Sequence, residues 1–505
     1  PGTPEDISPR GRPGTRRFNV AWFKKQRRQD KAHRKAPRTT RICRFEQMES
    51  RLMLSADPIQ IGAVFTELSS TSSTDTQGDR FEIVWTGGAA GTQLTELRIS
   101  GDINQNGILD TGDVFFDIDG SGPGVGPFFP FTIAADSDIK ADQITWTLSD
   151  DKTTLILYIQ GWDAGEKLIF EIDVDEVDNV PNSLVEGAEF QGSILTATWV
   201  DTNGHHEVVT ASGTFFDNYD HLIPAGVDVP RDSELPPGEG TDERTAGTGF
   251  TVQQQVKPFT ISGTVYHDVN LDGDHDGGEQ GIAGVQLSLY RFNESTGQWE
   301  DTGLRATTDQ DGNFSFTSNI PGRYRVVETQ PTGYFSTGST AGTGGTVESV
   351  DAITDITLLG GENSTGHKFG EALPGTLSGN VYHDADNDGI RDVGEMGIGG
   401  VTIRIDSVDG SYTGYTTTNA DGTWSISGLD PTKTYIVTEV QPSGTWIDGK
   451  DAAGTLGGTA ENDIVKNISF TASGQHGENY NFGELLPATL SGRVFADYNN
   501  NVVFD

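Results

Sequence analysis

The chain contains a single cysteine, Cys43, among 505 residues, so no disulfide can form within it. Small extracellular domains commonly depend on disulfides because their hydrophobic cores are small. If the domains of this chain are extracellular, another stabilising link has to take that place, and bound metal is one. No run of 18 apolar residues occurs either, so we expect no transmembrane helix in this segment.

Basic residues are scarce outside the first 56 positions. Residues 1–56 hold 15 Lys and Arg against 5 Asp and Glu, a net charge of about +10. The rest of the chain holds 19 Lys and Arg against 69 Asp and Glu, a net charge of about −50. Because such a body repels phosphate, we expect no nucleic-acid partner. The acidity favours cation binding and solubility.

Residues 1–56 form a basic segment that we expect to be disordered, since blocks of like charge usually stay solvated. Its end, residues 45–56, reads F-E-Q-M-E-S-R-L-M-L-S-A. This resembles the E-x-R-x-L-L-S-A signature near the N-terminus of large secreted proteins of planctomycete bacteria, which implies an export or surface-sorting signal. The matching residues are Glu49, Arg51, Leu54, Ser55 and Ala56. Met53 stands where the signature has Leu, and the change to acidic sequence at Asp57 favours a processed head.

Residues 57–223 carry short alternating runs of β-branched and aromatic residues, separated by Gly, Asn and Asp clusters. The clearest runs are 80–85, 143–148, 153–159, 167–174 and 194–199. Period-two patterning with this spacing predicts an antiparallel β-sandwich. Aromatic residues in this region suit either the core or a sugar-stacking face, and core packing is the better account. They are Trp162, Trp199, Phe128, Phe129 and Phe131.

One loop of this domain, from Asp102 to Asp113, reads D-I-N-Q-N-G-I-L-D-T-G-D. It places oxygen side chains at positions 1, 3, 5, 9 and 12 and glycine at position 6, which is the spacing of an EF-hand-type calcium loop. The candidate ligands are Asp102, Asn104, Asn106, Asp110 and Asp113. Asp113 is one methylene shorter than the usual Glu, so we expect weaker binding. A metal-free Asx/Gly turn is the alternative. Dockerin modules, which pair such loops with helices, are excluded because strand and turn residues follow.

Residues 224–257 are rich in Pro, Gly and charge and poor in apolar residues. Such a composition has too little apolar surface to fold by itself. We therefore expect a semi-extended linker.

The calcium-type spacing recurs from Asp268 to Glu279 and from Asp384 to Glu395, and a third copy begins at Asp497. The copies start 116 and 113 residues apart, so the sequence predicts a tandem array. The first copy offers Asp268, Asn270, Asp272, Asp276 and Glu279; the second offers Asp384, Asp386, Asp388, Asp392 and Glu395; the third offers Asp497, Asn499 and Asn501. Position 7 binds through its backbone carbonyl, which assigns Asp274 and Ile390. The third copy has Val502 at position 6 instead of glycine, which puts its turn in doubt.

The two complete units, residues 258–373 and 374–487, share further segments in the same order, and residues 488–505 begin a third. Each unit has a G-[IV]-x-G-V strand after the loop, a D-G turn that predicts a hairpin, a V-x-E-x-x-P strand and a closing F-G-E. The spacing indicates about seven strands in roughly 113 residues, the size of an immunoglobulin-like sandwich. The last copy stops within its loop, and the chain does not begin with Met, so we expect a fragment of a longer polypeptide.

From residue 258 onwards the sequence resembles the B domains of serine-aspartate-repeat surface adhesins, the SdrD B-like family. The resemblance implies immunoglobulin-like domains that calcium stiffens into a rod, with the loop residues above as ligands. A related pilin family forms a Lys–Asn isopeptide bond with a catalytic Glu in the V-x-E-x-x-P strand, where Glu328 and Glu439 stand here. The opening strands contain no Lys to react, so we expect hydrogen-bonded, partly buried carboxylates instead.

The sequence contains no nucleophile, zinc-protease or phosphate-loop motif, and we expect no enzymatic activity. His267 and His383 precede the loops and are expected to be structural, and the adjacent pair His205 and His206 is poorly arranged for chelation. We therefore predict an all-β, secreted or cell-surface protein that uses calcium ions and binds a surface glycan or a matrix protein. Its role would be structural or adhesive. Two alternatives stay open: a carbohydrate-binding module with Trp162 or Trp199 as platform, and an accessory region of a larger secreted enzyme.

Overall fold

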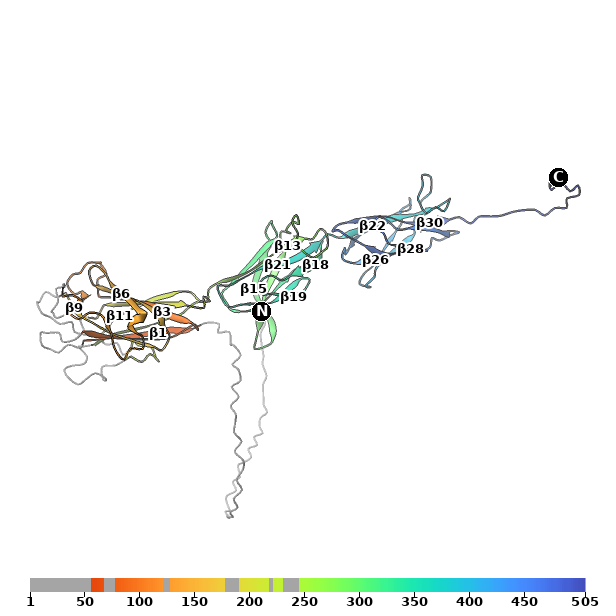
Figure 1. Ribbon diagram of the computed structural model, residues 1–505. Helices are drawn as coiled ribbons and strands as arrows, with labels where there is room; N and C mark the ends of the chain where they lie inside the picture. The colour runs from red at the N-terminus through yellow and green to blue at the C-terminus, as the bar shows by residue number, and fades with distance from the viewer. Residues whose placement is uncertain are drawn as a thin grey trace, which may run out of the picture. The chain divides into compact units, whose positions relative to one another are not determined.

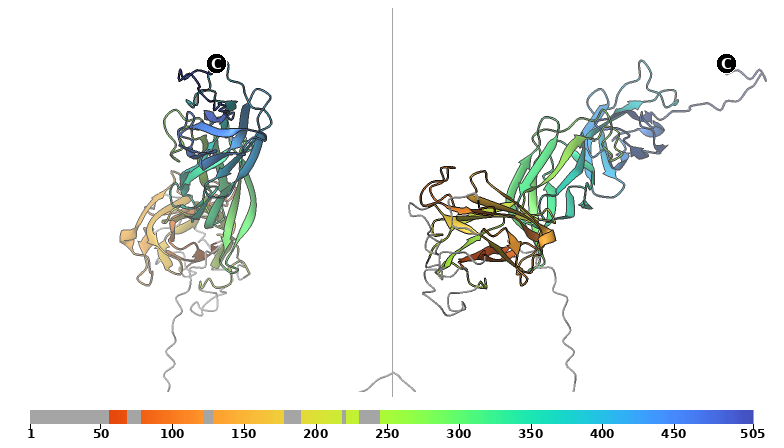
Figure 2. Two further views of the ribbon diagram at one scale, coloured as in Figure 1. Left: turned by 90° about the vertical axis from the view of Figure 1, so that its right-hand side faces the viewer. Right: turned by 60° about the vertical axis from the view of Figure 1, so that its left-hand side comes forward.

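The structure is a computed structural model that describes residues 56–67, 78–120, 128–177, 190–217, 221–229 and 245–504. The basic segment and the sorting motif lie outside these residues, apart from Ala56. Almost every described element is a strand, and the one helical element is a short 3-10 turn, η1 (Ala141–Gln143). Figure 1 and Figure 2 show the strands of the first domain in red to yellow and those of the two repeats in green to blue. The all-β prediction is confirmed.

The first domain contains two five-stranded sheets. In order across the first sheet, the strands are β12 (Thr245–Val252), β1 (Asp57–Thr66), β2 (Asp79–Gly88), β8 (Lys167–Ile172) and β5 (Thr132–Ile133). Across the second sheet they are β11 (Val209–Thr214), β10 (Ile194–Asp201), β3 (Thr92–Ser100), β7 (Thr154–Trp162) and β6 (Ile144–Leu148). A separate antiparallel pair is made by β4 (Val114–Phe116) and β9 (Val174–Glu176).

Aromatic side chains fill the space between these two sheets. Trp85, Trp162 and Trp199 are completely buried, and the rings of Trp85 and Trp199 meet edge to face at 6.2 Å. Strand β10 shows how alternation produces this core, because Leu195, Ala197 and Trp199 all point inward. Truncating one of these tryptophans to alanine is expected to cost about 3–5 kcal/mol.

The predicted linker at residues 224–257 is wrong in part. Strand β12 pairs antiparallel with β1 over eight residues, from Ile59 opposite Val252 to Thr66 opposite Thr245. Val227 and Val229 are buried against β1 and β2. The Gly-rich composition of β12 hides its role, because a strand that adds to a preformed edge depends on its backbone hydrogen bonds more than on its side chains. Residues 230–244 lie outside the described residues.

The two repeats share one architecture, in which a four-stranded sheet accompanies a five-stranded sheet. In the first repeat the four-stranded sheet is β16 (Asn313–Ser318), β13 (Phe259–His267), β21 (Asn363–Ala372) and β18 (Phe335–Thr340). Its five-stranded sheet is β15 (Gln298–Thr307), β14 (Gln286–Asn293), β17 (Gly322–Glu328), β20 (Ala352–Leu358) and β19 (Thr346–Ser349).

The second repeat has the same strand order. Its four-stranded sheet is β25 (Thr423–Leu429), β22 (Gly375–His383), β30 (His476–Leu485) and β27 (Ile447–Ala452). Its five-stranded sheet is β24 (Thr413–Thr417), β23 (Thr402–Ser407), β26 (Thr434–Glu439), β29 (Ile464–Ser469) and β28 (Thr459–Glu461). Each repeat thus has more strands than the seven expected, and the short strands β19 and β28 are the ones that the sequence pattern does not reveal.

The opening and closing strands of each repeat lie side by side and run parallel, β13 with β21 and β22 with β30. This pairing fastens the first segment of the domain to the last. The calcium-type loop follows directly after the opening strand, so its first residue starts at the end of the parallel pair. Asp268 donates its backbone N–H to the carbonyl of Glu371, and Asp384 does the same to Glu484, both at 2.9 Å.

The D-G turns do not close hairpins as the sequence predicted. The turn at Gly312 connects β15 to β16, which belong to different sheets, and the turn at Gly422 likewise connects β24 to β25. A side chain at Gly312 would meet the carbonyl of Val265 at 2.2 Å, so the turn packs directly over the opening strand. Sequence alone cannot separate a turn within one sheet from a turn between two, because both need the same left-handed backbone.

No helix among the described residues is long and apolar enough to span a membrane.

Candidate metal centres

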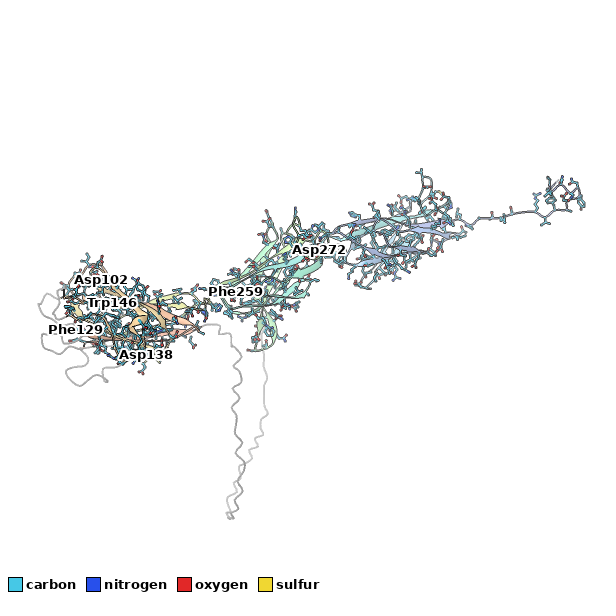
Figure 3. All side chains as sticks on the ribbon, in the orientation of Figure 1. Asp102, Phe129, Asp138, Trp146, Phe259 and Asp272 are labelled. Carbon is cyan, nitrogen blue, oxygen red and sulfur yellow. The ribbon has the colours of Figure 1, made fainter. Side chains whose placement is uncertain are left out.

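All four calcium-type loops adopt one backbone turn. The N–H at position 6 donates to the carboxylate at position 1 in every copy: Gly107 to Asp102 at 2.7 Å, Gly273 to Asp268 at 3.0 Å, Gly389 to Asp384 at 2.9 Å and Val502 to Asp497 at 2.7 Å. Positions 4 and 6 have left-handed φ angles, for example +57° at Asn387 and +84° at Gly389. This turn wraps the chain around its first carboxylate. Figure 3 labels Asp102 and Asp272 on two of the loops.

The carboxylate at position 12 closes each complete loop. Glu395 accepts from the N–H of Ala385 at 2.8 Å and from that of Asp392 at 2.9 Å. Glu279 accepts from Val269 and Asp276, and Asp113 accepts from Ile103 and Asp110, in the same two positions. The shorter Asp113 therefore makes the same two contacts as the glutamates, because the backbone lies close enough to reach it.

The second-repeat loop gathers carboxylate oxygens most closely. Ligand atoms of Asp384, Asp386 and Glu395 lie within 4.8 Å of one another, as do those of Asp386, Asp388 and Asp392. Asp384 is fully buried. The pKa of the Asp386 carboxyl is raised, and the largest cause of that shift is repulsion from Asp388. Oxygen-only ligands that repel one another fit a hard cation such as Ca²⁺, whose charge would relieve that repulsion.

The first-repeat loop also fits a cation, with one carboxylate fewer at the side-chain ligand positions 1, 3, 5, 9 and 12. Asp268 is fully buried, and its Oδ1 makes no hydrogen bond. The amide of Asn270 donates to Asp272 at 2.7 Å and to Asp276 at 3.4 Å. At the position of Asn270 the second repeat has the carboxylate of Asp386. A buried carboxylate oxygen without a hydrogen bond is costly unless a cation or a proton satisfies it.

The first-domain loop satisfies its own carboxylates more fully. Asn104 and Asn106 each donate an amide hydrogen to Asp110, at 2.7 and 2.8 Å. Asp102 and Asp113 are buried and accept backbone N–H groups. Because amides replace two carboxylates, this loop repels itself less, and a cation gains less by binding there. The residues Val114–Phe116 after the loop form β4, in agreement with the strand predicted there from the sequence.

The third-copy loop departs from the expectation raised by Val502. This residue takes a φ of +60°, and Asn500 takes +61°, so the turn forms despite the Cβ atom. Asn499 and Asn501 are exposed, and Asp497 is half-buried. A β-branched residue in this region is strained by about 1–2 kcal/mol, so the loop keeps the shape at a cost in stability.

The remaining histidine and tryptophan candidates have structural surroundings. His267 and His383 are half-buried, with ring centroids 6.1 Å from Tyr334 and 5.7 Å from Trp446. His206 Nδ1 lies 3.0 Å from Asp201. Because the structure buries Trp162 and Trp199 completely, neither can be a sugar platform. Phe131 packs against Trp146 and Phe170, and Phe128 is partly exposed.

Glu328 and Glu439 differ from the expectation of hydrogen-bonded carboxylates. They are 4% and 3% exposed, and none of their carboxylate oxygens makes a hydrogen bond. Burial, followed by repulsion from Glu371 and Glu484 respectively, raises the pKa of each to about 9. Burial also raises the pKa of Glu371 and of Glu484 to about 7.

These glutamates belong to carboxylate groups that the sequence did not reveal. One group comprises Glu328, Asp351 and Glu371, and its counterpart comprises Glu439, Asp463 and Glu484. A third group, Asp117, Asp173 and Asp175, lies in the first domain. One signal was available in the sequence, since Glu328 continues the inward alternation of Tyr324 and Val326 on β17. Its partners come from distant strands.

Comparison with known proteins identifies the two repeats. The family model of the SdrD B-like domain matches residues 259–369 and 375–483. Each repeat thus matches the SdrD B-like domain family over nearly its whole length. This bears out the resemblance read from the sequence for these domains.

Curated relatives of these domains come from staphylococci. Serine-aspartate repeat-containing protein F of Staphylococcus epidermidis is 32% identical over 203 residues, 40% of this chain and 11% of that protein. Protein C of Staphylococcus aureus strain N315 is 31% identical over 229 residues, 44% of this chain and 23% of that protein. Protein D of strain Newman is 29% identical over 366 residues, 68% of this chain and 25% of that protein. The chain thus spans a quarter or less of their length.

Solved pilin structures align more distantly. The shaft pilin spaA from Lactobacillus rhamnosus GG aligns with 46% of this chain and 99% of its own, at 14% identity and a TM-score of 0.23. The minor pilin GBS52 of Streptococcus agalactiae aligns with 47% of this chain and 100% of its own, at 13% identity and a TM-score of 0.23.

Proposed function

We propose that this chain is a non-enzymatic part of a secreted or cell-surface protein, in which calcium stabilises SdrD B-like domains as a rigid stalk. The first domain is then the candidate recognition head, with a surface glycan or a matrix protein as its class of partner. The observation that carries the proposal is the recurrence of one cation-type turn at the same place in successive domains.

The chemistry of the loops supports calcium as the stabilising link. In each repeat a loop of carboxylates and carbonyls follows the opening strand, where it is bonded to the closing strand through the backbone of its first residue. A cation held by Asp384, Asp386, Asp388, Asp392 and Glu395, with the carbonyl of Ile390, would fasten this loop to the parallel pair β22–β30. The corresponding set in the first repeat includes Asp274 at position 7.

The expected size of the effect follows from binding linkage. A ligand that binds only the folded state stabilises it by about 2.7 kcal/mol when its concentration is a hundred times Kd. For a domain of about 100 residues, 1 kcal/mol shifts the unfolding midpoint by roughly 4–8 °C. Millimolar extracellular calcium can supply that excess, because extracellular modules bind with Kd values on the order of 10⁻⁴ M or higher.

Thermal unfolding of the whole chain in calcium and in EDTA tests the calcium part of the proposal. We expect the transition of the repeats to lie about 10 °C or more lower in EDTA. The variant Glu478→Gln serves as a control, because this exposed residue lies on β30 outside the loops and its loss removes one charge. Equal midpoints in calcium and EDTA would contradict calcium stabilisation.

The recognition role needs a separate measurement. Retention of the chain on insoluble glycans or on immobilised matrix proteins, lost when residues 57–252 are replaced by an unrelated domain, is the expected result. The carbohydrate-binding alternative based on Trp162 or Trp199 is not carried further, since both side chains are buried. Absence of retention on every surface would remove the adhesive role.

A further inference from the structure

Each repeat contains a second group of carboxylates, separate from the calcium-type loop. In the first repeat the cluster consists of Glu328, Asp351 and Glu371, and each residue places an oxygen within 4.8 Å of the other two. In the second repeat the cluster consists of Glu439, Asp463 and Glu484, with the same spacing. We call these the interior clusters. None of their residues is a candidate ligand of the loops.

The glutamates of the interior clusters are buried without satisfying their oxygens. Glu371 and Glu484 are fully buried, and one carboxylate oxygen of each makes no hydrogen bond. Glu328 and Glu439 are almost fully buried, and neither oxygen of either residue makes one. Because Glu328 and Glu439 each share their cluster with a second buried glutamate, the unsatisfied oxygens face one another across a small space.

The two clusters have the same backbone framework. Glu328 ends β17, and its N–H donates to the carbonyl of Asp351 at 2.9 Å, in the turn between β19 and β20. Glu439 ends β26, and its N–H donates to the carbonyl of Asp463 at 2.8 Å, in the turn between β28 and β29. The arrangement is therefore a feature of the domain, since it is built twice from different side-chain surroundings.

Each interior cluster joins the two sheets of its repeat. Glu328 lies on β17 of the five-stranded sheet and Asp351 in the turn between its strands β19 and β20, whereas Glu371 lies on β21 of the four-stranded sheet. No described Lys, Arg or His forms an ion pair with any of the six cluster carboxylates. Neutral side chains donate to the clusters: Gln330 donates to Glu371 and Gln441 to Glu484. The aspartates accept from Ser336 in the first repeat and from Asn462 in the second. Two buried carboxylates without a counter-charge repel each other strongly.

We propose that each interior cluster is a second cation site of its domain, which takes a hard divalent ion of the calcium type. Three carboxylates supply oxygen ligands only, and oxygens bound to Ca²⁺ at about 2.3–2.6 Å lie up to roughly 5 Å apart, which matches the spacing of the cluster atoms. The ion satisfies the oxygens that lack hydrogen bonds and links the two sheets. The interior site thereby stabilises packing within one domain, on residues other than those of the loop.

The surroundings predict tighter binding in the second repeat. In the first repeat Ser336 lies opposite Glu371 and donates to Asp351 at 2.6 Å. In the second repeat Asp448 lies at the matching position, opposite Glu484. Asp451 adds a further carboxylate, which accepts the N–H of Asp463 at 2.8 Å. More negative charge around the site raises its affinity for a divalent cation.

Calorimetric calcium titration gives the number of calcium ions bound by the whole chain. The difference between this number and that of a variant without the interior sites counts those sites. The double variant Glu328→Gln with Glu439→Gln keeps the side-chain shape and removes one charge from each cluster. We expect it to bind two calcium ions fewer than the unsubstituted chain. Its midpoint in EDTA should be equal or higher, because the substitutions relieve repulsion in the metal-free form, so a folding failure would itself contradict the proposal.

A loop variant separates this proposal from the function proposed above. Asp268→Ala with Asp384→Ala removes the first ligand of each loop and leaves the interior clusters intact. On that background the two glutamine substitutions are again expected to lower the count by two. If the loop variant loses calcium while the glutamine variant retains the full count, the loop sites stand and the interior sites are overturned. The reverse result would overturn the loop sites alone.

Discussion

The two repeats have the same strands and the same cation-type turn, yet they differ in charge at matching positions. In the loop, Asn270 of the first repeat corresponds to Asp386 of the second. In the interior cluster, Ser336 corresponds to Asp448, and Asp451 adds another carboxylate. Both changes add carboxylates in the second repeat, at a side-chain ligand position of the loop and beside the interior cluster.

This comparison separates what the fold requires from what can vary. The same backbone hydrogen bonds hold the loop and the interior cluster in both repeats, so they belong to the architecture. The number of carboxylates around each site differs, and with it the repulsion that a cation relieves. Burial, together with repulsion from Asp463 and Asp448, raises the pKa of Asp451 to about 6, although backbone hydrogen bonds to its carboxylate oppose that rise. The second repeat should therefore depend more on cations than the first.

Removing the first ligand of each loop should have the largest effect. Asp384→Ala and Asp268→Ala each delete a fully buried carboxylate that accepts the N–H at position 6. In millimolar calcium we expect each change to lower the midpoint of its own repeat by about 10 °C, through lost calcium binding and an unsatisfied backbone. Differential scanning calorimetry measures this. A larger loss for Asp268→Ala than for Asp384→Ala would contradict the ranking of the repeats.

The pH dependence in EDTA should be the next largest effect. The folded-state pKa of Glu328 and of Glu439 is about 9, against an ordinary 4.5, so between these pH values the folded state binds more protons than the unfolded state. Stability therefore falls as the pH rises through this window. We expect the midpoint to drop by about 5 °C or more between pH 5 and pH 9.

A matched variant identifies the groups responsible for that slope. Glu328→Gln with Glu439→Gln should flatten the part of it between about pH 7 and pH 9, because glutamine does not titrate, while Glu371 and Glu484, with a pKa of about 7, keep a slope at lower pH. Carboxyls with lowered pKa values, such as Asp301 at about 2, act only at lower pH and leave this window unaffected. A slope that persists unchanged in the variant would assign the pH dependence to other groups.

Exchanging the residues at position 3 tests the charge difference between the loops. Asn270→Asp adds a carboxylate beside Asp272 and Asp276, whereas Asp386→Asn removes one from the second loop. We expect calcium affinity to rise on the order of fivefold in the first loop and to fall by a similar factor in the second, since ligand charge tunes such loops. Titrations of the two single variants check this, and changes of the same sign would disprove the charge argument.

The smallest effect is expected in the third loop. Val502→Gly removes the strain of a β-branched residue at a φ of +60°. The relief of about 1 kcal/mol should strengthen cation binding there by roughly fivefold. Terbium luminescence of the variant and of the unsubstituted chain measures the change. Val503→Gly is the matched control, because it alters the next residue and leaves the strained position in place.

The sequence predicted the fold class and the two repeats correctly, and the loop ligands stay a prediction. Each complete loop is a continuous run of twelve positions whose spacing is set by local backbone geometry, so its candidate ligands follow one another in the sequence. The strands predicted at 80–85, 143–148, 153–159, 167–174 and 194–199 also occur, because alternation is a local signal. The linker and hairpin predictions failed where the answer depended on which edge or sheet a segment joins.

What the sequence by itself determined is thus local: strands, turns and a cation-type loop after each opening strand. Tertiary structure alone decided that β12 completes a sheet and that the D-G turns cross between sheets. It also decided the interior clusters, since Glu328, Asp351 and Glu371 meet only when the five-stranded sheet that contains β17 packs against the four-stranded sheet that contains β21. Packing of the two sheets brings together carboxylates that are distant in the chain, and no local sequence pattern predicts that contact.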